Sequence, residues 1–231
     1  MNNKTAIITA ASKGMGLACA EKLHAEGYQL AILSRSSEIH DLASRLGGIA
    51  VQGSTDNLED LTRLVDATLE TYRQIDVVIN NTGHPPKGEL LELTDAQWSD
   101  GLNLALMNVV RMSRLVAPHM SGGGSIINIS TFGAKEPSLS FPISSVARTA
   151  LSSFTKLFAI KYGPSNIRMN NILPGFIDSY KADAETIKQI PMLRQGTPDE
   201  VGELAAFLAS DKSGYITGQD FLIDGGLVKS I

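Results

Sequence analysis

A turn with two glycines follows the first apolar run of the chain and leads into a helical pattern. It reads Thr9-Ala10-Ala11-Ser12-Lys13-Gly14-Met15-Gly16. Glycine lets the backbone approach a phosphate closely, and the N-terminus of the following helix favours the phosphate's negative charge. The turn therefore predicts a site for a dinucleotide pyrophosphate, although an ordinary strand–helix turn has a similar composition. The residues expected to contact the cofactor here are Thr9, Ala11, Ser12, Lys13, Gly14, Met15 and Gly16.

The end of the second apolar run reads Leu33-Ser34-Arg35-Ser36 and carries no carboxylate. A site selective for NAD usually has an acidic residue at this point, which bonds the ribose 2′-hydroxyl. The guanidinium of Arg35 can instead bind a 2′-phosphate through two hydrogen bonds, and Lys13 can add a second positive charge. The alternative is that both are solvated surface cations. We predict that Ser34 and Arg35 bind the cofactor and that the cofactor is NADP(H).

Three later segments combine glycine with polar residues near the ends of predicted strands. They are Asn80-Asn81-Thr82-Gly83, Pro174-Gly175-Phe176-Ile177-Asp178-Ser179, and Tyr215-Ile216-Thr217-Gly218-Gln219 followed by Asp224-Gly225-Gly226. With the first turn, and in this order, they resemble the TGxxxGxG, NNAG and PGxxxT motifs and the C-terminal ending of the short-chain dehydrogenase/reductase family. Ala10 replaces the first glycine of that pattern, and Ser179 replaces its threonine. The resemblance spans almost the whole chain.

The resemblance implies a contact for each of these motifs. Gly14 and Gly16 are expected to pack against the diphosphate, and Asn81 to lie near the adenosine ribose. Ile177 and Ser179 are expected to contact the nicotinamide end. The other motif positions expected on the cofactor side are Gly83, Pro174 and Gly175. A Cβ at Ala10 would disfavour the positive φ angle that glycine adopts easily.

The family's chemistry rests on an asparagine, a serine and a Tyr-x-x-x-Lys pair. A gap-free alignment through Asn128-Ile129-Ser130-Thr131 and the helix around residue 148 predicts Asn103 at the asparagine position and Thr131 at the serine position. Ser144 then falls at the tyrosine position and Arg148 at the lysine position. None of the five tyrosines has a lysine four residues later. The chain is therefore expected to be a divergent member with an atypical active site.

The two replacements at the Tyr-x-x-x-Lys positions both lie on the family's proton path. The hydroxyl of Thr131 can still hydrogen-bond a substrate oxygen. The alcohol of Ser144, by contrast, is a far weaker acid than a phenol, whose pKa is about 10. Arg148 can bind ribose hydroxyls but does not deprotonate in proteins. We therefore expect cofactor binding to be retained and proton delivery to be non-standard.

Another group must then supply the proton, or the substrate must react without a general acid. His84 follows the Asn-Asn-Thr-Gly turn directly, and histidine titrates close to neutral pH. Tyr180, just after Ser179, is a second candidate, although either residue would also suit an ordinary loop. A pre-protonated iminium needs no proton donor in the hydride step, and conjugated enones or quinones can be protonated later by water.

Three functions remain open from the sequence. The first is an NADP(H)-dependent oxidoreductase that transfers a hydride to or from a small carbonyl, imine or conjugated substrate. The second is an NADP(H)-binding protein without redox turnover, either a sensor or a partner subunit. The third is a lyase, isomerase or cyclase that uses the same pocket. The family resemblance also implies a homo-oligomer, either a homotetramer or a dimer.

The elements that must position these residues alternate between short β-branched runs and longer helical patterns, which predicts a doubly wound parallel sheet. Predicted strands are 5–9, 29–34, 49–53, 75–80, 125–130, 168–173 and 220–224. Predicted helices are 14–26, 38–46, 58–73, 95–120, 143–162 and 198–210. No break in composition divides residues 1–231, so we expect one α/β Rossmann domain of seven strands. Ligands bind such sheets beyond the carboxyl ends of the strands.

Composition excludes several other classes of function. The net charge is −4 without basic or acidic runs, which argues against nucleic acid and anionic membranes as partners. The single cysteine, Cys19, has no intrachain partner, and no Cys/His cluster suggests a metal site. Hydrophobic residues make up 43% of the chain, which is ordinary for a globular protein. We expect a cytoplasmic protein that acts on a small molecule.

Overall fold

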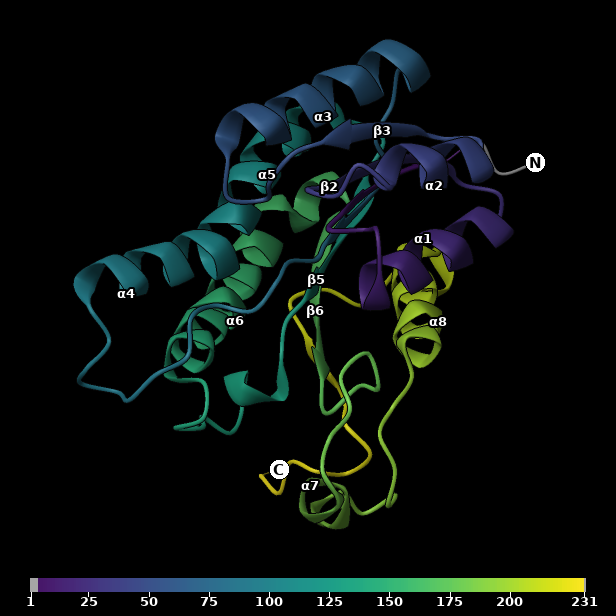
Figure 1. Cartoon of the computed structure of the whole chain (residues 1–231). Coiled ribbons are helices and arrows are strands. Elements are labelled where there is room, and N and C mark those ends of the chain that lie inside the picture. Colours follow the sequence, from purple (N-terminus) through teal and green to yellow (C-terminus); the bar gives the residue numbers. More distant parts are fainter. Residues whose placement is uncertain (1–3, 231) are drawn as a thin grey trace.

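The structure is a computed structural model that describes residues 4–230. Its seven strands form one parallel sheet in the order β3-β2-β1-β4-β5-β6-β7, which confirms the doubly wound α/β fold (Figure 1). The strands are β1 Thr5–Thr9, β2 Gln29–Ser34, β3 Ile49–Gln52, β4 Val77–Asn80, β5 Gly124–Ile129, β6 Ile167–Pro174 and β7 Asp220–Ile223. The order reverses beside β1, between β1 and β4, so a crevice is expected at the carboxyl ends of these two strands.

Helices cover both faces of the sheet. They are α1 Gly14–Ala25, α2 Ile39–Arg45, α3 Leu58–Tyr72, α4 Asp95–Leu102, α5 Asn108–Val116, α6 Pro142–Tyr162, α7 Ala184–Gln189 and α8 Pro198–Ala209. Figure 1 shows α1 and α8 on one side of β5 and β6, and α4 and α6 on the other. The central strands are continuous apolar runs because both of their faces are covered. Ile7 and Ile8 on β1, for example, are fully buried in opposite halves of the core.

The helix predicted over residues 95–120 forms over residues 95–119, but it is irregular. The structure divides it into α4, a π-helical segment at Asn103–Met107, α5, and a 3₁₀ turn at Ala117–His119. A π segment adds one residue to a helical turn and shifts the side chains that follow. The 3₁₀ turn contains Pro118, which has no backbone N–H to continue the α-helical ladder.

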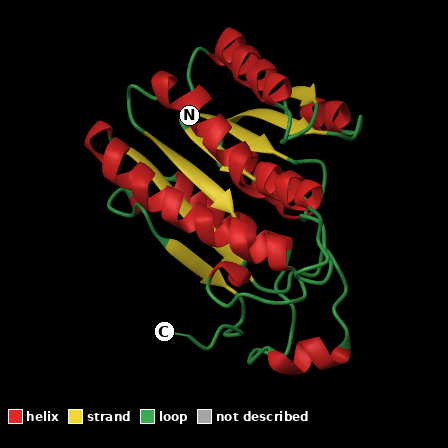
Figure 2. Ribbon diagram, turned by 90° about the vertical axis from the view of Figure 1, so that its left-hand side faces the viewer, coloured by secondary structure: helices red, strands yellow, loops and turns green. Residues whose placement is uncertain are grey.

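The short helix α7 was not expected from the sequence. It has six residues and buries none of them, so it leaves no apolar periodicity to detect. Its N-cap is Asp183, whose carboxylate accepts a hydrogen bond of 2.7 Å from the backbone N–H of Thr186. Figure 2 shows α7 set apart from the sheet and reached by long loops.

A row of three amide side chains and one carboxylate runs across four neighbouring strands, β4, β5, β6 and β7. Asn80, Asn128, Asn171 and Asp220 are paired in register. Hydrogen bonds of 2.9, 2.8 and 2.8 Å connect them in sequence. Thr155 of α6 donates to Asn171 over 2.9 Å, which ties that helix to the row. Because buried polar groups are costly unless paired, this row fixes the position of α6 against the sheet.

None of the helices within residues 4–230 is both long enough and apolar enough to cross a membrane.

Candidate cofactor and active site

A cleft of about 760 Å³ lies at the carboxyl ends of β1, β2 and β4. Ten of the residues predicted from the sequence line it. They are Ser12, Lys13, Gly14, Met15, Ser34, Arg35, Asn81, Gly83, His84 and Ser179. The cleft therefore unites the turn after β1, the end of β2, the turn after β4 and the loop after β6, as the strand order requires.

The backbone of the turn after β1 depends on small residues. Ala10 has φ +48°, and Gly14 has φ +56°. A Cβ on Gly16 would collide with the carbonyl oxygen of Ala10 and would lie 2.6 Å from Nδ2 of Asn81. The left-handed conformation costs a non-glycine residue about 1–2 kcal/mol. Ala10 therefore accepts the strain that its position in the motif imposes.

The N-terminus of α1 presents free backbone donors at this turn. Its N-cap, Lys13, is extended and makes no side-chain capping hydrogen bond, and the first turn holds no acidic residue. Gly14 and Met15, at the start of the helix, line the cleft. Free N–H groups and the positive end of a helix dipole suit a bound phosphate. The residues present therefore fit the pyrophosphate of a dinucleotide.

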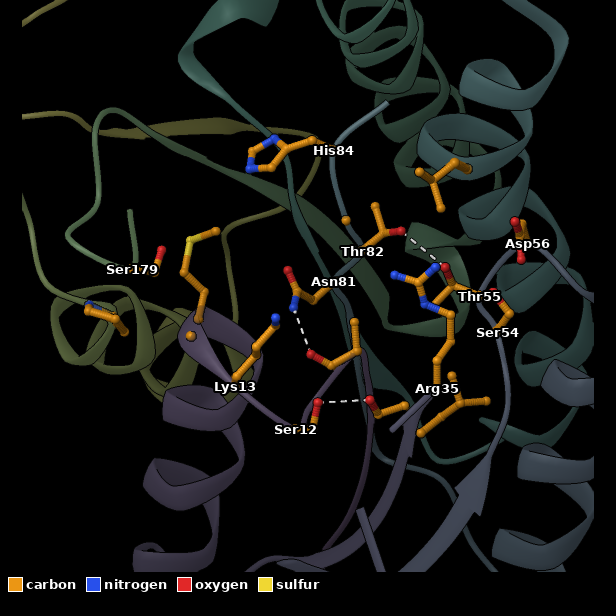
Figure 3. A pocket seen from close by; sticks show the side chains of 18 of the residues that line it. Ser12, Lys13, Arg35, Ser54, Thr55, Asp56, Asn81, Thr82, His84 and Ser179 are labelled. Atoms are coloured by element: carbon orange, nitrogen blue, oxygen red, sulfur yellow. Dashed lines mark hydrogen bonds between the residues drawn. The ribbon is translucent and has the colours of Figure 1, made fainter. Parts of the chain in front are cut away.

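Two other predicted contacts, Thr9 and Ala11, support the cleft from behind and do not line it. The hydroxyl of Thr9 is buried and donates a 2.7 Å hydrogen bond to the carbonyl oxygen of Asn81. The Asn81 amide Nδ2 donates to the Ala10 carbonyl over 3.1 Å, as Figure 3 shows. Ala11 is fully buried, and its N–H donates to the Leu33 carbonyl at the end of β2. These bonds hold together the turns after β1, β2 and β4.

Arg35 and Lys13 extend into the cleft from two sides (Figure 3). Neither side chain makes an ion pair with any residue that the structure describes. Beneath them the Ser34 hydroxyl donates to the Ser12 hydroxyl over 2.8 Å. This end of the cleft therefore offers two unengaged cations and two hydroxyls, which is a donor set suited to an anionic group.

The loop after β3 also lines the cleft, and sequence reasoning missed it. Ser54, Thr55 and Asp56 line the same wall as Arg35. The hydroxyls of Thr55 and Thr82 are 3.0 Å apart (Figure 3). The detectable signal was a polar run directly after a strand that neighbours β2.

The segment after β6 is only partly exposed to the cleft. Ser179 lies opposite Gly14, because a Cβ on that glycine would be 3.5 Å from the Ser179 Cβ. Ile177 is buried and pairs with Gly196 in an isolated bridge. Gly175 donates its N–H to the Ile223 carbonyl, next to Pro174 at the end of β6. Of this motif's predicted cofactor contacts, Ser179 alone reaches the cleft lining, while Pro174, Gly175 and Ile177 hold the loop in place.

Ser144 and Arg148 lie one turn apart on α6, so they share a face of the helix. Both are buried, with exposed fractions of 7% and 5%. Among the described residues, no carboxylate or hydrogen-bond acceptor engages the guanidinium of Arg148. Burial lowers its pKa to about 10, so it stays charged at neutral pH. A buried charge without a partner costs free energy, and a bound ligand that pairs with it recovers that cost.

Thr131 sits at the end of β5, in the loop that packs on α6. Its hydroxyl accepts a weak hydrogen bond of 3.4 Å from the Gly133 N–H. A Cβ on Gly133 would lie 3.2 Å from the Ser145 hydroxyl, next to Ser144. Phe132 in the same loop contacts Phe141 and Phe176 with ring centroids 5.6 and 5.5 Å apart. The loop that follows Thr131 therefore packs on the N-terminal part of α6 and carries an aromatic wall.

Comparisons with known proteins match this architecture over nearly its full length. Residues 9–228 match the family described as Enoyl-(Acyl carrier protein) reductase. The chain is 35% identical to Dehydrogenase/reductase SDR family member 4 of Caenorhabditis elegans, covering 97% of this chain and 95% of that protein. The chain belongs to the short-chain dehydrogenase/reductase family.

Other members of the family show the same breadth of similarity. Oxidoreductase UcpA of Salmonella typhimurium is 32% identical over 98% of this chain and 95% of its own length. The crystal structure of L-sorbose reductase from Gluconobacter frateurii, complexed with NADPH and L-sorbose, superposes with a TM-score of 0.92. It is 28% identical, and the match covers 100% of this chain and 98% of that one. The chain is thus similar to oxidoreductases of the short-chain dehydrogenase/reductase family across its whole described fold.

Asn103, predicted at the family's asparagine position, directs its side chain to the loop after β3. Its amide Nδ2 donates a 3.3 Å hydrogen bond to the carbonyl oxygen of Asp56, in the loop after β3. Arg111 donates to the same oxygen over 2.9 Å. Asn103 opens the π-helical segment, and the gap-free alignment did not anticipate this irregularity. The contact gives Asn103 a role in holding a wall of the cleft and does not support its predicted place in a proton relay.

His84 lines the cleft from the loop after β4 and meets Tyr180 from the loop after β6. The two rings lie edge to face, with centroids 5.6 Å apart and an interplanar angle of 65°. Partial burial lowers the pKa of His84, and the positive charges of Lys87 and Arg148 lower it further. His84 is therefore mainly neutral at physiological pH, with one nitrogen that donates and one that accepts.

Proposed function

We propose that this protein is an NADP(H)-dependent oxidoreductase that acts by hydride transfer on a small carbonyl, imine or conjugated substrate. The observation that carries the proposal is the cleft at the start of α1, where uncapped helix donors meet the unengaged cations Lys13 and Arg35. Membership of an oxidoreductase family supports the redox assignment. The proposal includes proton delivery by a group other than a tyrosine on α6.

The preference for NADP(H) over NAD(H) rests on the charge at the end of β2. No carboxylate stands in Ser34-Arg35-Ser36 to bond a ribose 2′-hydroxyl. The Arg35 guanidinium can bind a 2′-phosphate through two hydrogen bonds, and the Ser12 and Ser34 hydroxyls lie beside it. The similar L-sorbose reductase was crystallised with NADPH, which agrees with this choice.

Thr131, Ser144 and Arg148 each have a defined part in this proposal. A bound nicotinamide cofactor supplies or accepts the hydride. The hydroxyls of Thr131 and Ser144 donate hydrogen bonds to the substrate oxygen. Arg148 remains protonated, so it stabilises negative charge in the site and binds ribose hydroxyls without moving a proton. The aromatic wall of Phe132, Phe141 and Phe176 suits an apolar part of the substrate.

Cofactor choice is tested by measuring Kd for NADPH and NADH through quenching of protein fluorescence. We expect NADPH to bind at least about tenfold more tightly, which corresponds to roughly 1.4 kcal/mol. Tighter binding of NADH would contradict the assignment of Arg35 and Lys13.

Turnover is tested by following NADPH absorbance with a panel of ketones, enones, quinones and cyclic imines. A Ser144→Tyr/Arg148→Lys variant serves as the control for an intact pocket. Turnover by the wild type is the expected result, and the responding class identifies how much acid help the substrate needs. A silent wild type beside a variant that reduces ketones would replace this proposal with the second candidate.

The second candidate is an NADP(H)-binding protein without turnover. It is favoured by one observation, namely that the buried Ser144–Arg148 turn contains no group able to release a proton near neutral pH. Tight NADPH binding without turnover on any substrate class would establish it.

We also propose that the protein is a homo-oligomer, either a dimer or a tetramer. The outer face of α6 supports this, because Val146, Leu157 and Ile160 are 52%, 63% and 70% exposed. Light scattering after size-exclusion chromatography measures the mass directly. We expect a multiple of the 24.7 kDa chain, and Leu157→Asp/Ile160→Asp to dissociate it.

A further inference from the structure

We infer that Tyr180 and His84 together deliver the proton that α6 cannot supply, with the Tyr180 phenol as the donor and His84 as its relay to water. This inference rests on the proposed hydride transfer and names the residues that complete it. Both side chains line the cleft, and their rings are in edge-to-face contact at 5.6 Å. They come from the loops after β4 and β6, which lie nearly 100 residues apart in the sequence.

The backbone around Tyr180 is fixed on both sides, although its side chain is 65% exposed. Gln195 donates from Nε2 to the Tyr180 carbonyl over 2.8 Å, and its Oε1 accepts from the Ala182 N–H over 3.0 Å. The Tyr180 N–H donates to the Ile177 carbonyl over 3.3 Å. The Asp178 N–H donates to the Gly196 carbonyl over 2.9 Å, and the Gly196 N–H donates to the Phe176 carbonyl over 3.0 Å, which anchors the start of the loop. The phenol therefore projects from a held backbone into the cleft and at the same time reaches water.

The charges around His84 favour its neutral form. Lys87 lies on the same loop, and Arg148 faces it from α6; both lower its pKa. Lys13 of the α1 turn and the carboxylate of Asp178 also line the cleft. A neutral imidazole donates at one nitrogen while it accepts at the other, which is what a relay to solvent requires.

Reduction of a carbonyl in this site combines one hydride transfer with a proton relay. The carbonyl carbon gains a hydride from bound reduced cofactor, and the two π electrons move to the carbonyl oxygen. The O–H bond of Tyr180 breaks as its proton transfers to that oxygen, which gives an alcohol and a phenolate. His84 then donates its N–H proton to the phenolate while its other nitrogen accepts a proton from water, which leaves a hydroxide ion in the solvent. Thr131 and Arg148 stabilise the oxygen while its charge develops.

The activity test compares Tyr180→Phe with Tyr215→Phe, using the best carbonyl substrate of the panel. Tyr215 is the matched control because it is fully exposed and does not line the cleft. General acid catalysis contributes about 10²–10⁴-fold. We therefore expect Tyr180→Phe to lower kcat at least about 100-fold while Kd for NADPH changes less than about twofold. Tyr215→Phe should match the wild type.

A purely structural role for Tyr180 gives a different pattern. If the ring only packs against the substrate or covers it, Tyr180→Phe keeps the ring and leaves kcat unchanged, and that result would overturn the inference. His84→Gln should lower kcat less than Tyr180→Phe and should remove the low-pH limb of the kcat profile. An unchanged profile in His84→Gln would remove His84 from the relay.

A second measurement needs no turnover. The chain has four histidines, so the His84 imidazole signals can be assigned by NMR with His84→Gln and titrated in the NADP⁺ and NADPH complexes. The two cofactors carry the same phosphates and differ by the positive charge of the oxidised nicotinamide. We expect His84 alone to titrate at lower pH with NADP⁺ than with NADPH. Equal midpoints would place the pair away from the reacting ring and overturn the inference, whereas failure of NADPH to bind would instead overturn the proposed function.

Discussion

Two arginines of this fold stand near the proposed cofactor under opposite conditions. Arg35, at the end of β2, extends into an open cleft where water solvates its charge. Arg148, on α6, is 5% exposed and meets no acceptor among the residues the structure describes. An exposed cation costs little before its ligand binds, whereas a buried one destabilises the free protein until a ligand pairs with it. Arg35 can therefore select an anionic ligand at little cost to the free protein. Arg148 lowers the stability of the free protein, and a ligand that pairs with it restores that stability.

This contrast separates the residues proposed to bind the cofactor from those proposed to take part in the reaction. The turn after β1, the α1 N-terminus and Arg35 offer uncapped backbone donors and a cation without an ion-pair partner in the described part of the chain, which suit a phosphate. The Ser144–Arg148 turn of α6 carries an alcohol and a charge, but neither group releases a proton near neutral pH. A protein altered only in this second group would still bind the cofactor and would have to obtain its proton elsewhere.

We expect the largest effect from Gly16→Ala, in the turn after β1 that is proposed to bind the cofactor phosphates. The new Cβ would collide with the Ala10 carbonyl and press on the Asn81 amide, so the turn must open. Overpacking of this kind costs roughly 2–3 kcal/mol, which predicts about 30–100-fold weaker NADPH binding by fluorescence titration. Gly163→Ala is the control, because a Cβ there meets nothing within 4 Å. Unchanged binding in Gly16→Ala would show that this turn does not hold the phosphates.

Arg35→Ala tests whether the end of β2 selects a cofactor that carries a 2′-phosphate. Loss of charged hydrogen bonds to a 2′-phosphate costs about 1.5–3 kcal/mol, so Kd for NADPH should rise roughly 10–100-fold. Kd for NADH should stay the same, since it has no 2′-phosphate. Arg45→Ala is a matched control, because Arg45 lies on α2 and pairs with Glu21 outside the cleft. An equal loss for both cofactors would refute a 2′-phosphate contact.

Arg148→Met tests whether the buried charge on α6 destabilises the protein without cofactor. Replacing a buried, unpaired charge with an apolar chain of similar length should stabilise the free protein by about 1–2 kcal/mol. The melting temperature without cofactor should therefore rise, while the further rise on adding NADPH should shrink. Arg114→Met, at an exposed position on α5, should change neither quantity. A lower melting temperature in Arg148→Met would show that the guanidinium is already compensated in the free protein.

We expect the smallest effect at the start of α8, away from both Arg35 and Arg148. Arg194 and the capping contact with Thr197 hold the pKa of Glu200 at about 2, well below its ordinary value. A lowered acid pKa adds stability above the unfolded value of about 4.3, and this is lost as pH falls toward 2. Because the side chain is 41% exposed, solvent limits the gain to about 0.5–1 kcal/mol.

Chemical denaturation of Glu200→Gln at several pH values checks this directly. The variant should be less stable than the wild type at pH 7 and equal to it near pH 2, with unchanged NADPH affinity at pH 7. A constant difference at all pH values would mean that the effect is not electrostatic.

The sequence by itself determined the sheet and about half of the residues that line the cleft. Short β-branched runs and turn residues act through neighbours in the chain, so β1 and β2 were predicted with their observed bounds. The turn from Thr9 to Gly16 and the Arg35 position follow from the same local rule, because parallel strands bring their carboxyl ends to one edge.

Contacts between distant segments were decided only by the tertiary structure. The π-helical segment turned Asn103 toward Asp56, and the loop after β3 added Ser54 to the cleft. Packing also buried Arg148 without a partner. The meeting of His84 with Tyr180 depends on how far the loops after β4 and β6 reach across the cleft. Local periodicity specifies which elements form, whereas the distances between loops depend on how all the elements pack, and no single stretch of sequence contains that information.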